Sequence, residues 1–305
     1  MSCVPNECFS GSASSRARRS AKSPIVAQRL KRFPSIISKL ERFRTMTLTQ
    51  MQDIGGLRAV IDSMTGLRKI HELYKGQDSP HKLFKTNDYI ATPKPMNGYR
   101  SLHLIYRYIN EDDPRYNDMH LEIQLRTVLQ HAWGTAVETI DTLFGQKLKA
   151  SLGDKSWTDF FRAASAAFSH LEEEAVVQEY SGLTRKQLFK LVAEMEAELQ
   201  VLHKLGTLSN AIESITYVGS KAKYYLLILD AKFRSVTIQS FAERNYMQAL
   251  SQYVQAESRA RKGDQIEAVL VTGPAIANLK KAYPNYYLDT TKFSSTIQKI
   301  IKESV

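Results

Sequence analysis

Cysteine is scarce in this sequence, and long apolar runs are absent. Both cysteines of the 305 residues, Cys3 and Cys8, lie near the N-terminus, which argues against a disulfide framework. The longest uninterrupted apolar run, Tyr224–Leu229, is far shorter than the roughly 20 residues that a membrane-spanning helix needs. We therefore expect no membrane partner. Because no apolar segment marks the N-terminal region as a secretory signal, we also expect a cytoplasmic location.

Glycine and proline are few, and several nucleotide-binding motifs are missing. With 14 Gly, 9 Pro and 43% hydrophobic residues, the composition excludes collagen-like and disordered classes and predicts a globular chain of about two domains. The spacings G-x-x-x-x-G-K-[ST] and G-x-G-x-x-G do not occur, which argues against P-loop kinases and Rossmann dehydrogenases. His71-Glu72 lacks the second histidine of the H-E-x-x-H zinc motif.

Positive charge is concentrated at the N-terminal end. The net charge is +11, and the first 50 residues carry ten Lys/Arg against two Glu, a local excess of +8. Such a cluster attracts polyanions, whether free nucleotides, RNA or an acidic membrane surface. Residues 1–24 are rich in Ser and Arg and have no hydrophobic period, so they predict a disordered basic tail.

Hydrophobic periodicity predicts an α+β region over residues 25–150. Apolar residues at helical spacing predict a helix across 26–43. Apolar runs and alternation predict three strands, and helical spacing predicts a helix at 65–74. Thr127 and Gln130 match a capping box, which predicts a further helix from residue 127 to about 149. The expected strands are 54–61, 102–108 and 119–126.

The second half of the chain divides into two predicted segments. Residues 151–215 show only helical patterns, at 157–174 and 184–215, and predict a helical connector. Residues 216–305 alternate between strand and helix patterns and predict a smaller α/β domain, whose role stays open. Its expected strands are 224–230, 235–239 and 268–272, and its expected helices are 241–261, 274–283 and 291–301.

Five short polar motifs follow one another between residues 25 and 145. In order, they are R-L-K-R from Arg29 with Ser35 and Lys39 behind it, D-I-G-G-L-R from Asp53 to Arg58, D-Y-I-A-T-P-K ending at Lys94, N-G-Y-R-S-L-H from Asn97 to His103, and E-I-Q-L-R-T from Glu122. Together they resemble the synthetase domain of the RelA/SpoT alarmone synthetases, without the hydrolase domain of the long members. The resemblance implies a mixed sheet flanked by helices, of the nucleotidyltransferase kind.

Physical chemistry points to phosphoryl transfer from the same residues. This chemistry depends on alignment and on cations that neutralise phosphate charge, and the basic residues of the first two motifs supply such cations. Magnesium is usually held by one or two carboxylates together with phosphates and water. Asp53 and Glu122, each expected on a short apolar strand, are the candidates. The alternative for either carboxylate is a surface salt bridge.

The resemblance assigns a role to each motif residue. It implies that Mg²⁺ is held by Asp53 and Glu122, and that Glu122 also helps to activate the acceptor hydroxyl. Tyr99 matches the aromatic residue that stacks on the acceptor guanine. The implied ATP-binding residues are Arg29, Lys31, Ser35, Lys39 and Arg58, and those around the acceptor are Lys94, Asn97, Tyr99 and His103. Arg58 shares a strand face with Asp53 only if Gly55-Gly56 forms a β-bulge.

The sequence leaves the acceptor open. The leading hypothesis is a nucleotide pyrophosphokinase in which the 3′-hydroxyl of GDP or GTP attacks ATP, yielding (p)ppGpp and AMP. One alternative is a toxic relative that uses adenine nucleotides or the 3′ end of tRNA, and another is an inactive regulatory module. A homo-oligomer is compatible with all three.

Overall fold

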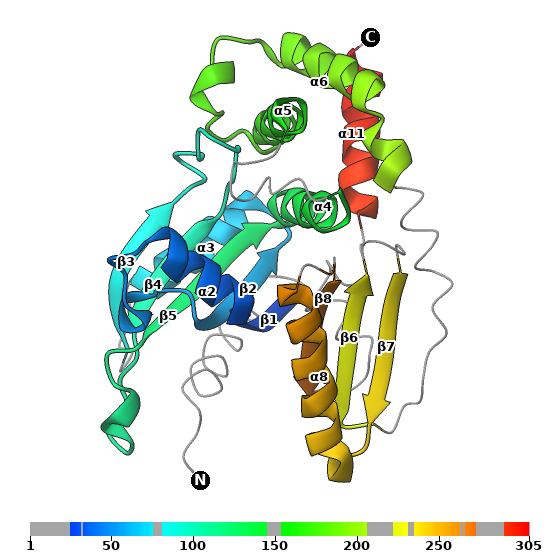
Figure 1. Cartoon of the computed structure of the whole chain (residues 1–305). Coiled ribbons are helices and arrows are strands. Elements are labelled where there is room, and N and C mark those ends of the chain that lie inside the picture. Colours follow the sequence, from blue (N-terminus) through cyan, green and yellow to red (C-terminus); the bar gives the residue numbers. More distant parts are fainter. Residues whose placement is uncertain are drawn as a thin grey trace. The chain divides into compact units, whose positions relative to one another are not determined.

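A five-stranded mixed sheet forms the centre of the first of two units (Figure 1). Its strands run in the order β1-β2-β5-β4-β3, and only β2 and β5 are parallel neighbours. This arrangement confirms the predicted α+β class. The strands are β1 (Ile25–Leu30), β2 (Gly55–Ile61), β3 (Lys82–Asp88), β4 (Leu102–Arg107) and β5 (His120–Thr127).

The computed structural model describes most of the chain. The described residues are 25–31, 33–75, 81–144, 154–205, 222–230, 235–262, 264, 266–272 and 290–304. Of these, the first unit contains those up to residue 93, then 100–131 and 172–175; the second contains 94–99, 132–171 and those from 176 onward. The predicted basic tail lies outside the described residues. The domain boundaries predicted at residues 150 and 215 stay predictions.

One face of the sheet is the hydrophobic core of the first unit. Helix α3 (Met64–Lys75) packs on it through Leu67, Ile70 and Tyr74, each at most 6% exposed. Because strand side chains alternate, the same strands turn their polar residues to the opposite face. The core residues of the strands are Leu57, Ala59, Ile61, Leu102, Leu104, Tyr106, Leu121, Ile123 and Leu125.

The helix predicted across residues 26–43 was wrong in its first part. Residues 25–30 form β1, which pairs antiparallel with β2, and only Phe33–Arg42 form a helix, α2. The open edge of β2 gives these residues backbone partners, and the Lys31 amide continues the pairing to the Ile54 carbonyl at 2.7 Å. Pro34 lies in the first turn of α2, where its missing N–H costs no hydrogen bond.

Aromatic residues of three helices pack together in the second unit. Phe293 of α11 (Thr291–Ser304) contacts Phe160, Phe161 and Phe168 of α5 (Lys155–Glu172) at ring-centroid distances of 5.6–6.5 Å. Trp133 of α4 (Val128–Phe144) donates its indole N–H to the Phe161 carbonyl at 2.7 Å. Helix α6 (Arg185–Leu199) packs against α11.

The second unit also contains a three-stranded antiparallel sheet in the order β7-β6-β8. The predicted strands are confirmed as β6 (Tyr224–Asp230), β7 (Ser235–Phe241) and β8 (Ile266–Thr272), and α8 (Tyr246–Arg261) packs on β6 and β8. The helix predicted at 274–283 lies outside the described residues. Short 3₁₀ turns occur at Leu48–Gln50, Pro114–Tyr116, Gln178–Tyr180 and Glu243–Asn245.

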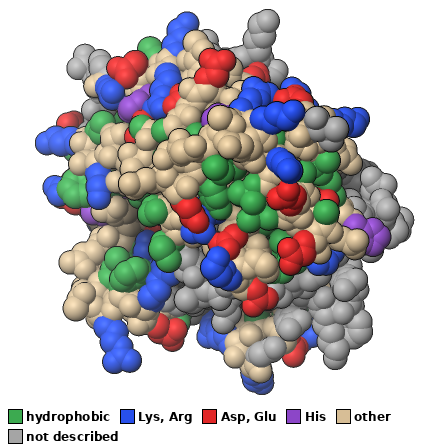
Figure 2. Space-filling model, turned by 90° about the horizontal axis from the view of Figure 1, so that it is seen from above, with side chains coloured by type: hydrophobic (Ala, Val, Ile, Leu, Met, Phe, Trp, Pro, Cys, Tyr) green, Lys and Arg blue, Asp and Glu red, His purple; other side chains and the backbone are tan. Residues whose placement is uncertain are grey.

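Surface charge is mixed outside the N-terminal region. On the face shown in Figure 2, basic and acidic side chains of the described residues are interspersed. Ion pairs such as Arg185–Glu303, at 2.6 Å, join them. None of the described helices combines the length and the apolar character that crossing a bilayer requires.

Candidate active site

The polar face of the first sheet carries a row of functional side chains across its central strands. The register pairs Gln124 of β5 with Arg58 of β2 on one side and with His103 of β4 on the other. Paired residues point to the same side of a sheet, so all three lie on the face opposite the hydrophobic core. Glu122 precedes Gln124 by two positions and shares this face.

Glu122 and His103 form a buried carboxylate–imidazole pair. Oε1 of Glu122 lies 2.7 Å from Nδ1 of His103, and Oε2 accepts a hydrogen bond from Nε2 of Gln124 at 2.5 Å. Glu122 is 8% exposed and His103 9%. The Tyr89 ring meets the His103 ring edge-on, with centroids 5.2 Å apart. Both carboxylate oxygens are therefore held in place, beside a group able to exchange a proton.

Asp53 lies between two lysines. Its Oδ2 is 2.6 Å from Nζ of Lys31, and its Oδ1 is 2.9 Å from Nζ of Lys39. Lys31 follows β1 and Lys39 lies on α2, so three segments meet at this carboxylate. Asp53 itself lies in the bend before β2; the prediction that it belongs to a strand was wrong.

The two lysines keep Asp53 ionised. Burial alone would raise its pKa, but the hydrogen bonds and positive charges of Lys31 and Lys39 outweigh burial and lower the pKa from 3.8 to about 2. The carboxylate is therefore charged at neutral pH. A charged acid between two cations is suited to hold a further cation or to orient the lysines toward an anion.

We expect Asp53 to contribute to stability in acid. A carboxyl group with a lowered folded-state pKa stabilises the fold above its unfolded pKa, near 4, and this stabilisation is lost as the pH falls through about 2. With allowance for solvent screening, the contribution is about 1–2 kcal/mol. Chemical unfolding at pH 7 and pH 2 measures it: Asp53→Asn should lower stability at pH 7 and have little effect at pH 2. An equal loss at both would contradict the assignment.

The strand register relates Asp53 to Glu122. Gly56, three residues after Asp53, is the Cα partner of Glu122, so both carboxylates belong to the same end of the parallel strands β2 and β5. A Cβ on Gly56 would lie 2.0 Å from the Glu122 carbonyl oxygen, so only glycine fits here. The pairing of β2 is continuous through Gly55 and Gly56, so the β-bulge that would place Arg58 on the same face as Asp53 is not formed.

Lys94, Asn97 and Tyr99 form a compact turn in the second unit. Gly98 has a φ of +75°, and Oδ1 of Asn97 accepts a hydrogen bond from the Tyr99 amide at 3.1 Å. Nζ of Lys94 lies 5.3 Å from the centroid of the half-buried Tyr99 ring, whose edge meets Trp133 at 6.3 Å. The turn thus combines a cation with an aromatic ring.

The structure brings the predicted residues together only in part. Asp53 meets two of the predicted ATP-binding lysines, and Glu122 meets His103. Arg29 pairs with Gly56 through β1 and Ser35 lies on α2, but both side chains are outside the described part. Sequence reasoning missed the contact from Gln124 to Glu122, although the alternation of β5 places both residues on one face.

The mixed sheet with its flanking helices defines an α+β protein, in which Glu122 contacts His103 and Asp53 contacts two lysines. Residues 28–140 match the sequence profile described as the region found in RelA / SpoT proteins. GTP pyrophosphokinase YwaC of Bacillus subtilis is 30% identical over 151 residues, which cover 48% of this chain and 69% of YwaC. The chain therefore belongs to the RelA/SpoT family, as the motifs indicated.

Other relatives match smaller or more divergent parts. The uncharacterized protein Rv1366 of Mycobacterium tuberculosis is 28% identical over 135 residues, 43% of this chain and 44% of that protein. Small alarmone synthetase 1 of Bacillus subtilis bound to its product pppGpp has 24% identity and a TM-score of 0.47, covering 56% of this chain and 90% of that one. Small alarmone synthetase 2 of the same organism has 30% identity and a TM-score of 0.42, covering 48% and 76%.

Proposed function

We propose that this chain transfers the pyrophosphate group of ATP to the 3′-hydroxyl of GDP or GTP, producing (p)ppGpp and AMP. The observation that carries the proposal is the buried pair of Glu122 and His103, a candidate proton acceptor on the polar face of the first sheet. The GTP pyrophosphokinase name of YwaC supports the choice of substrates.

Glu122 acts as the proton acceptor in the proposed reaction. The 3′-oxygen of the acceptor attacks the β-phosphorus of ATP, and the bond between that phosphorus and the oxygen that bridges it to the α-phosphate breaks. AMP leaves with the electron pair of that bond, and the proton of the 3′-hydroxyl passes to Glu122. His103 and Gln124 each contact one oxygen of this carboxylate and so orient it.

The two carboxylates fit a magnesium ion. Among the residues that the structure describes, no group of three or more His, Cys, Asp or Glu side chains could hold a metal. Mg²⁺ needs no such group, because it takes one or two carboxylates and completes its shell with phosphates and water. Asp53 and Glu122 would hold it, and the bound ion would neutralise charge on the phosphate oxygens.

The remaining residues are assigned to the two substrates. Lys31 and Lys39, already oriented by Asp53, bind the ATP phosphates, and Arg29, Ser35 and Arg58 complete that set. The Tyr99 ring stacks on the guanine of the acceptor, since base–aromatic stacking gives about 1–3 kcal/mol in single-stranded nucleic-acid binders. The residues assigned around the acceptor are Lys94, Asn97, Tyr99 and His103.

An acceptor assay tests the proposal. The purified full chain is incubated with Mg²⁺ and ATP labelled at the γ-phosphate, together with GDP, GTP, unlabelled ATP or deacylated tRNA in separate reactions. We expect label in GDP and GTP, with one AMP released per transfer. Label in adenine nucleotides or tRNA instead would assign the chain to the toxic type of relative. ATP binding without transfer to any acceptor would make it a regulatory module.

Lys39→Ala should weaken ATP binding selectively. A hydrogen bond from a charged group contributes about 1.5–3 kcal/mol, so the KM for ATP should rise about tenfold or more while the KM for GDP changes little. Initial rates at varied ATP and varied GDP measure both constants. Lys69→Ala, which removes an exposed lysine of α3, is the matched control. A rise in the KM for GDP alone would mean that the two pockets are exchanged.

A further inference from the structure

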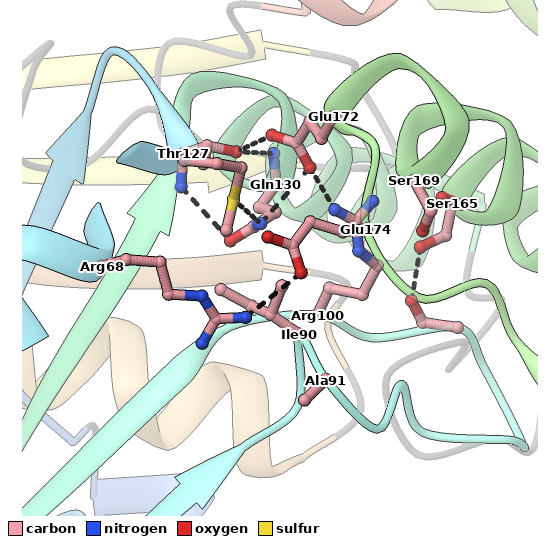
Figure 3. Close-up of polar contacts among 12 residues, drawn as sticks. Arg68, Ile90, Ala91, Arg100, Thr127, Gln130, Ser165, Ser169, Glu172 and Glu174 are labelled. Carbon is pink, nitrogen blue, oxygen red and sulfur yellow. Dashed lines mark hydrogen bonds and ion pairs between the residues drawn. The ribbon is translucent and has the colours of Figure 1, made fainter. Parts of the chain in front are cut away.

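An acidic segment that begins with the last residue of α5 binds two arginines of the first unit (Figure 3). Residues 172–175 belong to that unit, whereas the chain before and after them belongs to the second. Glu173 has a φ of +54° and is exposed, so the chain turns there while Glu172 and Glu174 point to their partners. Glu172 pairs with Arg100, and Glu174 pairs with Arg68 at 3.2 Å.

The carboxylate of Glu172 accepts hydrogen bonds from three side chains. Its Oε2 accepts hydrogen bonds from Nη2 of Arg100 and from Nε2 of Gln130, the latter at 3.3 Å, and its Oε1 accepts from Oγ1 of Thr127. The side chains of Arg100 and Glu172 are only 2% and 8% exposed. Thr127 and Gln130 also form the capping box that starts α4, with both of its hydrogen bonds at 3.2 Å.

Two of these donors lie at the ends of the strands that carry the Glu122–His103 pair, since Arg100 is two residues before β4 and Thr127 is in β5. Arg100 precedes His103 by three residues, about 10 Å of extended chain, and Thr127 is the last residue of β5. Between them, Oγ of Ser101 donates to the Leu125 carbonyl at 3.0 Å. Leu102 pairs with Leu125, and His103 pairs with Gln124 on the next rung. Glu172 therefore connects Arg100 to Thr127 at the end of the β4–β5 ladder that lies next to His103.

We propose that Glu172, through Arg100 and Thr127, is a positioning residue that fixes the ladder of β4 and β5 so that the His103 imidazole meets the Glu122 carboxylate. The effect of Glu172 on kcat rests on the proposed function, whereas its effect on the position of the His103 imidazole does not. A carboxylate suits this place because all three neighbours donate. A glutamine could still satisfy Thr127, whose hydroxyl can also accept, but its neutral amide would leave the buried Arg100 guanidinium without a charged partner at this position.

Glu174 offers a matched control in the same segment. It binds Arg68, whose other partner is Asp88, and Asp88 accepts the amides of Ile90 and Ala91 at 3.0 and 2.9 Å. Glu174→Gln removes one of the two carboxylates of Arg68 and leaves Asp88 in place. The change has the same chemistry as Glu172→Gln, two residues away, and it also removes a charge that acts on Arg100, but it leaves the hydrogen bonds of Glu172 to Arg100 and Thr127 in place.

The test follows the His103 ring and the kinetics together. The chain has seven histidines, so a protein with isotope-labelled imidazoles gives few NMR signals, and the His103→Gln spectrum identifies that of His103. Glu172→Gln should shift the His103 signal and lower kcat about 10- to 100-fold, with both KM values within about twofold of the parent. At a temperature at which all variants are folded, Glu174→Gln should shift the His103 signal much less than Glu172→Gln, and the destabilising core variant Ile70→Ala should leave it unchanged.

Each outcome decides the proposal. An unshifted His103 signal in folded Glu172→Gln overturns it. The proposal is also overturned if Ile70→Ala and Glu172→Gln are equally destabilised and have equally low kcat values, because the loss of rate would then come from lost stability alone. If Glu172→Gln does not fold, Glu172→Asp keeps the charge for Arg100 but is too short to reach both Arg100 and Thr127, and it should shift the same signal. If the parent protein labels no acceptor, the proposed function fails, while the imidazole signal still tests the positioning role.

Discussion

Glu122→Gln should reduce pyrophosphate transfer about a thousandfold. General base catalysis contributes about 10²–10⁴ in rate, and the glutamine amide can neither take the proton of the 3′-hydroxyl nor supply a charged ligand to Mg²⁺. The side chain keeps its size inside a site that is 8% exposed, so the fold should survive. Single-turnover transfer from labelled ATP to GDP measures the loss, and thermal unfolding confirms the fold.

Glu72→Gln is the matched control for this variant. Glu72 is exposed on α3 and pairs with Lys75 in the next turn, at 2.9 Å, so its amide should leave transfer at the parent rate. Because the two substitutions change the total charge equally, any shared effect would come from net charge. Undiminished transfer by Glu122→Gln would remove Glu122 from both its roles.

Asp53→Asn should also abolish most transfer, through a different cause. The amide cannot bind Mg²⁺ as a charged ligand, and it leaves Lys31 and Lys39 close together without the carboxylate that separates their charges. Loss of transition-state charge stabilisation of several kcal/mol corresponds to about a thousandfold in rate. The loss should be in kcat at saturating ATP, measured over a range of Mg²⁺ concentrations.

Asp62→Asn is the corresponding control at the other end of β2. Asp62 follows the last residue of that strand and is exposed, whereas Asp53 precedes the first. The same chemical change should leave transfer unaltered there. A parent-like kcat in Asp53→Asn, or full recovery at high Mg²⁺ without any change in the metal dependence, would contradict the proposed metal role.

Sequence patterns predicted the central strands because each of these strands has one buried face, which is visible in its own residues. The alternation in residues 120–127 and the apolar residues of 55–61 reflect one buried face, and both strands formed where expected. Residues 25–30 were assigned to a helix because their pairing partner, β2, lies some 30 positions further along the chain. Strand β3 was missed because residues 82–86 are exposed at the sheet edge and show no apolar face.

The candidate site was predictable as residue types but not as contacts. Alternation placed Glu122 opposite the core face, and its partner His103 was already among the predicted residues. The convergence of Lys31 and Lys39 on Asp53 depends on a strand, a helix and a bend meeting in three dimensions. Glu172 gave no signal, because its partners Arg100 and Thr127 lie 72 and 45 residues away. The functional roles of these residues stay predictions.

The position of the acidic segment determines how the chain can be shortened. A fragment that ends at residue 150, after the family motifs, would contain Arg100, Arg68 and Thr127 but neither Glu172 nor Glu174. Its Arg100, 2% exposed in the whole chain, would then be a cation in the interior without its carboxylate. We therefore expect a stable fragment with the family motifs to extend through Ala175 and to include the helix α5 that leads to it.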